Sequence, residues 1–191
     1  MTFGLRHVGI AMESLSAEVN KMLCVIAKLN DSAADTLVKL QRSADSHVSE
    51  MKPLYGHITI TSYVGDDESG FVRSCKQLLK GFSAFEVVYD KVEVLDETSV
   101  IVATPVKSEP LSSLHQRIAE LFYDSLDRWT KDYTWYPHTT LIFDPQSDLH
   151  DICNKVAAYF APFKAEVKTI EFSRVCENTY EIIDRIELPS G

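Results

Sequence analysis

Two short motifs place a histidine two residues before a threonine: His57-x-Thr59 and His138-x-Thr140. Each motif lies in an apolar, β-prone stretch, and residues i and i+2 of a strand point to the same face. Each motif would therefore present an imidazole beside a hydroxyl. Histidine carries protons near neutral pH, and a hydroxyl can donate to a phosphate oxygen. Two such pairs that face each other contain the groups needed to cleave a phosphodiester without a metal.

Cleavage of a phosphodiester requires a base and an acid. The base activates water or a ribose hydroxyl, and the acid protonates the leaving oxygen. Either histidine could fill either role, and the sequence does not choose between them; we take His57 as the base and His138 as the acid. Thr59 and Thr140 would donate to the non-bridging oxygens, where charge develops. Water would attack a 2′,3′-cyclic phosphate, whereas the neighbouring 3′-hydroxyl could attack a 2′-5′ linkage, and the sequence leaves both routes open.

A purely structural explanation competes with this chemistry. Either motif alone is better explained by a histidine that is satisfied in the core or at the surface and a threonine that favours a strand. The two motifs occupy corresponding places in the chain, 81 residues apart from His57 to His138. That correspondence favours a shared chemical role.

Four aromatic residues near these motifs are candidates for substrate contact. Tyr63 follows the first motif, Trp135 and Tyr136 precede the second, and Tyr180 lies near the end of the chain. Nucleic-acid bases stack on such rings. Core packing or loop anchoring explains the same residues, and the sequence leaves both explanations open.

The elements that must position the motifs follow from apolar periodicity and turn residues. We expect strands over residues 3–12, 54–64, 85–88, 91–95, 100–105, 137–143, 165–174 and 180–188. We expect helices over about residues 14–29, 33–43, 71–79, 110–129 and 149–160. Each half of the chain then has a helix before its motif strand, a turn and a short helix after it, and further strands. This order predicts one α+β domain over residues 1–191, built from two pseudo-symmetric lobes.

Composition and charge restrict the function. The chain has 191 residues, of which 45% are hydrophobic and 25% charged, which is ordinary for a soluble globular protein. The net charge of −9 argues against a protein that coats long nucleic acids, but not against a small phosphorylated ligand. We expect no membrane span, no signal peptide and a cytoplasmic monomer. The four cysteines form no CxxC pair, so we expect no zinc site.

The chain resembles the 2H phosphoesterase superfamily. The resemblance rests on the two histidine motifs, which stand here as GHITITSYVG, with Tyr63 in an aromatic position, and PHTTLIF. The region from Arg174 to Ile183 is similar to the final hairpin of that superfamily. The second motif departs from the pattern of bacterial cyclic phosphodiesterases, because it lacks their alanine-arginine ending.

This resemblance implies a bilobal fold in which two lobes of antiparallel sheet with outer helices surround a central cleft. It also implies a phosphodiesterase that needs no metal or other cofactor. The implied substrate is a small nucleotide or RNA end with a ribose 2′-linked phosphodiester, either a 2′,3′-cyclic phosphate or a 2′-5′ linkage. Two alternatives are an enzyme that degrades cyclic oligonucleotide signals and a protein that binds nucleotides or RNA ends without cleaving them.

Overall fold

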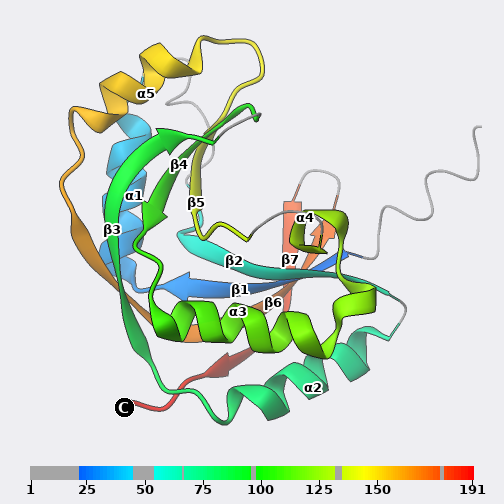
Figure 1. Ribbon diagram of the computed structural model, residues 1–191. Helices are drawn as coiled ribbons and strands as arrows, with labels where there is room; N and C mark the ends of the chain where they lie inside the picture. The colour runs from blue at the N-terminus through cyan, green and yellow to red at the C-terminus, as the bar shows by residue number, and fades with distance from the viewer. Residues whose placement is uncertain (1–21, 45–53, 66, 96–97, 132–134, 177–178) are drawn as a thin grey trace, which may run out of the picture.

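The computed structural model describes residues 22–44, 54–65, 67–95, 98–131, 135–176 and 179–191. Its strands form one antiparallel sheet in the order β2-β1-β6-β3-β4-β5, and β7 also pairs with β6 (Figure 1). The strands are β1 (Met22–Leu29), β2 (His57–Val64), β3 (Phe85–Val94), β4 (Val100–Pro105), β5 (Thr139–Phe143), β6 (Phe163–Cys176) and β7 (Thr179–Glu187). The helices are α1 (Asp31–Arg42), α2 (Glu68–Leu79), α3 (Glu109–Leu121), α4 (Arg128–Lys131) and α5 (Leu149–Ala157), with a 3₁₀ turn η2 (Tyr123–Ser125).

The segment Met22–Leu29 is a strand, so the expectation of a helix over residues 14–29 is wrong for its described part. β1 pairs with β2 on one side and β6 on the other, and neighbouring residues such as Val25 and Ile26 are both buried. A short run that is apolar on all sides fits a buried strand as well as a helix, and periodicity alone does not separate the two. The strand expected over residues 3–12 lies outside the described residues.

β3 is one strand rather than two. The sequence predicts a turn at Tyr89-Asp90, but Tyr89 pairs with Pro105 and Lys91 pairs with Thr104. Asp90 is therefore an extra residue in a continuous strand, a β-bulge. Both a turn and a bulge interrupt the alternation of polar and apolar residues, which explains the wrong expectation.

α3 is shorter than the helix expected over residues 110–129. It ends at Leu121, and Phe122 leaves the helical conformation. The Phe122 ring packs edge-on against Phe71, with 4.6 Å between ring centroids, and also approaches Tyr63. Burial of this ring against the first half of the sheet competes with continuation of the helix. The rest of the expected helix becomes η2 and α4.

The two halves of the sheet repeat the same plan. α1 lies between β1 and β2, and α3 lies between β4 and β5; α2 then leads to β3 and α5 to β6. β3 and β6 join the halves by antiparallel pairing centred on Val87 and Ala165. The expected α+β fold with pseudo-symmetric antiparallel halves is confirmed, although the halves belong to one continuous sheet.

The motif strands β2 and β5 are the two ends of the sheet order, yet they contact each other. The helices are exchanged between the halves: α1 packs against β5 and β6, and α3 packs against β2. Alternate residues of β1, including Leu23, Val25 and Ala27, belong to the hydrophobic core on one face of the sheet. The other face carries the motif side chains. In the part of the chain that the structure describes, no helix is long and apolar enough to cross a membrane.

Candidate active site

The first motif histidine is held by its own chain. His57 begins β2, and its Nδ1–H donates to the carbonyl oxygen of Tyr55 at 2.7 Å. This bond leaves Nε2 as the nitrogen that can exchange a proton with a ligand. Burial lowers the pKa of His57, and a positive charge on His138 lowers it further, whereas the Tyr55 carbonyl and Glu171 raise it. The effect of His138 on the pKa of His57 indicates that the second imidazole lies near the first.

The second motif repeats this arrangement. His138 lies immediately before β5, and its Nδ1–H donates to the carbonyl oxygen of Tyr136 at 2.8 Å. Burial lowers the pKa of His138 as well. Tyr55 and Tyr136 each stand two residues before their histidine, so both motifs read Tyr-x-His-x-Thr. This longer repeat is visible in the sequence and strengthens the correspondence between the halves.

A β-bulge follows the threonine of the first motif. Thr59 pairs with Ile26 and Thr61 pairs with Val25, so Ile60 is an extra residue in β2. Ile26 and Val25 point to opposite faces of the sheet, and so do Thr59 and Thr61. The bulge therefore ends the side-chain alternation that the motif begins.

The second motif has a bulge at the same position. Thr140 pairs with Val102 and Ile142 pairs with Ile101, so Leu141 is the extra residue in β5. Bulges are enriched beside active sites, where they redirect side chains. Two bulges at equivalent positions are therefore part of the architecture that presents the two threonines.

A glutamate lies in the same cross-strand row as each motif threonine. Opposite residues in an antiparallel pair share a face, and two equivalent rows cross three strands each: Thr59–Ile26–Glu171 and Thr140–Val102–Glu93. The glutamates therefore face the same side as the threonines. Within the described part of the chain, the hydroxyls of Thr59 and Thr140 bond no other group, which leaves both available to a ligand.

In the first half, Glu171 supports the tyrosine that holds His57. The Tyr55 hydroxyl donates to Glu171 Oε2 at 2.5 Å, and Glu171 is only 2% exposed. Burial and the neighbouring carboxylate raise the pKa of Tyr55, so the phenol stays protonated as a donor. Lys28, which pairs with His57 across β1 and β2, lies 5.9 Å from the centre of the Tyr55 ring.

The second half contains the matching groups. The Tyr136 hydroxyl donates to Glu93 Oε1 at 2.5 Å, and Thr104 donates to the same oxygen at 2.9 Å. These donors and Lys91 lower the pKa of Glu93, although burial opposes them. The Lys91 ammonium lies 2.9 Å from Glu93 Oε2 and 5.6 Å from the centre of the Tyr136 ring. Tyr136 thus contacts the site through both its carbonyl and its hydroxyl, while its contact with substrate stays a prediction.

Tyr180 also lies at the site. Its ring centroid is 5.6 Å from that of Tyr55 and 6.4 Å from that of His57, and its side chain is 40% exposed. Tyr180 reaches this position from β7, which pairs with the Glu171-bearing strand β6. Tyr180 therefore presents a partly exposed ring beside His57.

Trp135 contacts the first motif from the side. Its Nε1–H donates to the carbonyl oxygen of Thr59 at 3.1 Å, and its ring stacks on His115 with centroids 4.2 Å apart. His115 covers one face of the indole, so that face cannot receive a base. The contacts in the structure fit a role in holding β2.

Tyr63 lies apart from the other predicted site residues. The bulge at Ile60 turns Tyr63 to the opposite face, where it pairs with Leu23 of the core. Its ring stacks on Phe71 with centroids 4.2 Å apart, and only 6% of the residue is exposed. The expected contact with substrate does not fit this position, because strict alternation from His57 fails once an extra residue enters the strand.

The two motifs are joined directly. Thr139, the middle residue of the second motif, donates from Oγ1 to the carbonyl oxygen of His57 at 2.7 Å. The buried Tyr89 hydroxyl lies 2.6 Å from Thr139 Oγ1 and can donate to it. This contact sets β5 beside β2 at the level of the two histidines.

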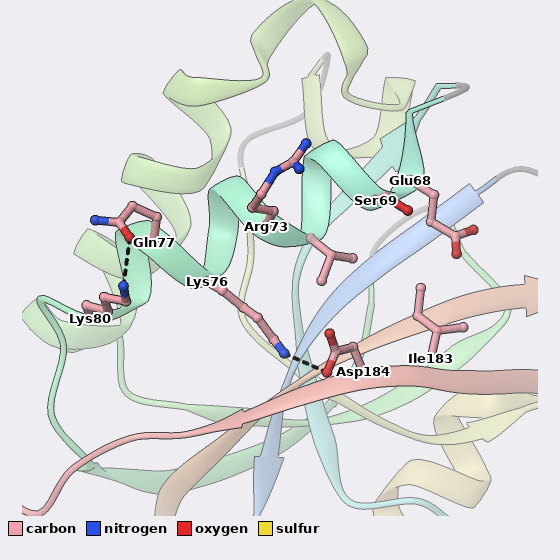
Figure 2. A pocket seen from close by; sticks show the side chains of 9 residues that line it. Glu68, Ser69, Arg73, Lys76, Gln77, Lys80, Ile183 and Asp184 are labelled. Atoms are coloured by element: carbon pink, nitrogen blue, oxygen red, sulfur yellow. Dashed lines mark hydrogen bonds and ion pairs between the residues drawn. The ribbon is translucent and has the colours of Figure 1, made fainter.

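A separate cavity of about 460 Å³ lies between α2 and β7. Figure 2 shows Arg73 and Lys76 of α2, and Lys80 just after it, along its wall, with the ammonium of Lys76 bonded to Asp184 at 2.6 Å. None of the motif residues lines this cavity. Among the described residues, no cluster of three or more His, Cys, Asp or Glu side chains could hold a metal ion.

The matched arrangement of the motifs agrees with a family comparison. The model of the 2′-5′ RNA ligase superfamily matches residues 29–177, which include both motifs. The chain belongs to this superfamily of 2H phosphoesterases. Among curated proteins, none is detectably similar to this 2H phosphoesterase in sequence.

Solved structures show the same fold for this 2H phosphoesterase. The protein TT0787 of Thermus thermophilus is 14% identical with a TM-score of 0.64, over 88% of this chain and 98% of that one. E. coli LigT complexed with NADP+ is 12% identical with a TM-score of 0.63, over 90% and 99%. LigT complexed with phosphate is 11% identical with a TM-score of 0.61, over the same shares.

Proposed function

We propose that this protein is a metal-independent phosphodiesterase that hydrolyses a ribose 2′-linked phosphodiester in a small nucleotide or RNA end. The bond is a 2′,3′-cyclic phosphate or a 2′-5′ linkage. The observation that carries the proposal is the matched pair His57 and His138. Each imidazole is fixed through Nδ1 by a backbone carbonyl and has Nε2 left for proton transfer.

His57 acts as the base and His138 as the acid. A base accepts a proton at Nε2 when it is neutral, and an acid donates one from Nε2 when it is protonated. His57 is the better base because it is the imidazole that Glu171 influences, and this carboxylate stabilises the charge that His57 acquires. The proton transfers contribute roughly 10²–10⁴-fold each to the rate, as general acid–base catalysis commonly does.

Thr59 and Thr140 donate to the non-bridging oxygens of the phosphate. Their hydroxyls face the same side as the histidines, and neither bonds another group in the described part of the chain. Lys28 and Lys91 add positive charge on this face near the two tyrosines. They favour an anionic ligand despite the net negative charge of the chain.

The 2H phosphoesterase superfamily and the solved neighbours support a nucleotide or RNA-end substrate. LigT, which shares the fold, has been crystallised with phosphate and with 3′-AMP. We extend this class of ligand to the present chain. Tyr180 is positioned to contact the nucleoside beside the phosphate, because its half-exposed ring lies near His57.

The test is a panel of substrates assayed in EDTA: 2′,3′-cyclic AMP, 2′-5′ oligoadenylate, a 3′-5′ oligonucleotide and a cyclic dinucleotide. We expect cleavage of one or both ribose 2′-linked substrates without added metal. His57→Ala and His138→Ala should each reduce turnover by at least about 10²-fold, whereas His150→Ala, at the exposed start of α5, should not. Cleavage of none of the four, loss of activity on chelation, or near-normal rates in either motif variant would contradict the proposal.

A further inference from the structure

The bulge after each motif threonine has its carbonyl bound by a side chain from a helix. His115 of α3 donates from Nδ1 to the carbonyl oxygen of Ile60 at 2.7 Å. Gln41 of α1 donates from Nε2 to the carbonyl oxygen of Leu141 at 2.9 Å. A bulge disrupts the ladder of hydrogen bonds locally, so each side chain replaces a partner that the neighbouring strand does not supply.

These two contacts are equivalent and crossed. α1 precedes the first motif strand, yet Gln41 binds the bulge of the second; α3 precedes the second motif strand, yet His115 binds the bulge of the first. The exchange follows from the packing of each helix against the opposite motif strand. Gln41 and His115 therefore make the same contact in the two halves, each as a donor to the carbonyl of a bulged residue. A search for repeated residue types would miss this equivalence.

Both donors are held rigidly. Gln41 is 5% exposed, and its bond to Leu141 is buried. His115 stacks on Trp135, which itself donates to the carbonyl oxygen of Thr59. β2 is thus bound at two consecutive carbonyls, one at the motif threonine and one at the bulge.

We propose that Gln41 and His115 are positioning residues, and that each one sets the place of the motif threonine in the opposite half. His115 fixes the bulge at Ile60 and hence the Thr59 hydroxyl, while Gln41 fixes the bulge at Leu141 and hence the Thr140 hydroxyl. Neither residue touches the substrate. This inference rests on the proposed function, because it assigns the two side chains to the geometry of phosphate stabilisation.

Kinetics provide the first test. His115→Ala and Gln41→Ala should each lower kcat by roughly 10- to 100-fold, since small misplacements of a catalytic group have effects of this size. KM should change by less than about threefold, because the misplaced hydroxyls stabilise charge that develops mainly in the transition state. The apparent pKa values of the acidic and alkaline limbs of the pH–rate profile should not change, since neither side chain transfers the proton. An unchanged kcat in folded variants would overturn the proposal.

Conservative variants separate positioning from bulk packing. His115→Gln keeps an N–H donor of the kind that the other half uses, so it should recover most of the kcat lost in His115→Ala. Gln41→Glu keeps the shape but removes the donor, so it should be at least as impaired as Gln41→Ala. The control is Ile118→Val, which trims a buried side chain of the same helix as His115 and should leave kcat unchanged. Equal loss in Ile118→Val and His115→Ala, or no recovery in His115→Gln, would assign His115 to general stability.

Resonances of the two threonines provide a test that needs no turnover. In NMR spectra, His115→Ala should shift the amide and methyl resonances of Thr59 and leave those of Thr140, and Gln41→Ala should do the reverse. If the wild-type protein cleaves no phosphodiester, the proposed function fails, and this crossed pattern still supports the positional link. The positional link would be overturned if His115→Ala shifted only the Thr140 resonances and Gln41→Ala shifted only those of Thr59.

Discussion

The Thr139 hydroxyl donates to the carbonyl oxygen of His57 at 2.7 Å and thereby joins the middle of one motif to the start of the other. Its single proton is used in this bond, so Thr139 accepts from the Tyr89 hydroxyl at 2.6 Å. Tyr89 is fully buried and stacks on Phe163 with centroids 4.9 Å apart. The two halves are therefore connected at the histidines by a chain of hydrogen bonds that begins in the core.

Thr139→Val should destabilise the protein and reduce its activity. The substitution keeps the β-branched shape but leaves the Tyr89 hydroxyl and the His57 carbonyl without this partner. A buried polar group that loses its partner costs about 1–3 kcal/mol. We expect a fall of that size in the free energy of unfolding by denaturant titration, and a lower kcat because the strand that carries His57 loses its tie to β5.

The matched control for this prediction is Tyr89→Phe. It removes the buried hydroxyl while the Thr139 hydroxyl still binds His57, so activity should be largely kept. In the double variant, Thr139→Val should destabilise less than it does alone, because there is no longer a Tyr89 hydroxyl to leave unpaired. Strictly additive losses of stability would show that the hydroxyl pair is not coupled.

The pH optimum of kcat/KM should lie below 6.5. Burial lowers the pKa of both His57 and His138 from the ordinary value of 6.5. In a two-histidine mechanism, the rate falls at low pH when the base is protonated and at high pH when the acid is deprotonated. Both limbs then lie on the acid side of 6.5, and so does the maximum between them.

Substrate should move this optimum upward. A bound phosphate anion favours the protonated form of both imidazoles, which raises their pKa values in the complex. The profile of kcat should therefore peak at a higher pH than that of kcat/KM. NMR titration of the two imidazoles in the free protein provides the independent measurement. A kcat/KM maximum above pH 7 would contradict the expected direction of both shifts.

Glu171→Gln should move only one limb of the profile. Glu171 raises the pKa of His57, so its neutralisation should lower that pKa further. Because we assign His57 as the base, the acidic limb should shift to lower pH while the alkaline limb stays in place. If the alkaline limb moves instead, His57 is the acid and the two roles are reversed.

The equivalent glutamate of the other half is the control for that assignment. Glu93 binds Tyr136 as Glu171 binds Tyr55, but it does not contribute to the lowered pKa of His138. Glu93→Gln should therefore leave both limbs within experimental error. A shift as large as that in Glu171→Gln would point to a general effect of charge on this face.

The sequence predicts the motifs well and the groups around them poorly. The histidine and threonine of each motif could be found because their spacing of two fits a strand. The position of Glu171 could not be predicted. Val167 pairs with Leu29 and Thr169 pairs with Lys28, so Lys168 is an extra residue, a β-bulge. After this bulge, each side chain of β6 points to the face opposite to the one that strict alternation predicts. Alternation along β6 would place Glu171 in the core.

The other wrong predictions of which face a side chain occupies also arise from β-bulges. The bulge at Asp90 turns Glu93 and Lys91 toward the site, and the bulge at Ile60 turns Tyr63 away from it. A bulge adds one residue and has no strong signature of its own, so a period of two carried across it inverts every later assignment. The crossed contacts of Gln41 and His115 could not be predicted from the sequence either, since they depend on which helix packs against which strand.

Gly56 offers a last prediction, because it stands directly before His57 and has no room for a side chain. A Cβ at this position would lie 2.9 Å from the Ala34 Cβ and 3.0 Å from the Ala34 Cα of α1. The equivalent residue of the second motif is Pro137, which carries a side chain. The start of β2 is thus positioned by direct contact with a helix.

Gly56→Ala should push β2 away from α1 and displace His57. We expect a loss of about 1–3 kcal/mol in the free energy of unfolding, typical of overpacking, together with a reduced kcat. Ala34→Gly in the same chain should restore part of both, since it removes the nearer of the two atoms. Gly81→Ala is the control, because its Cβ would have 3.7 Å to the nearest atom and should be tolerated. Equal stability and activity in Gly56→Ala and Gly81→Ala would show that this contact does not position His57.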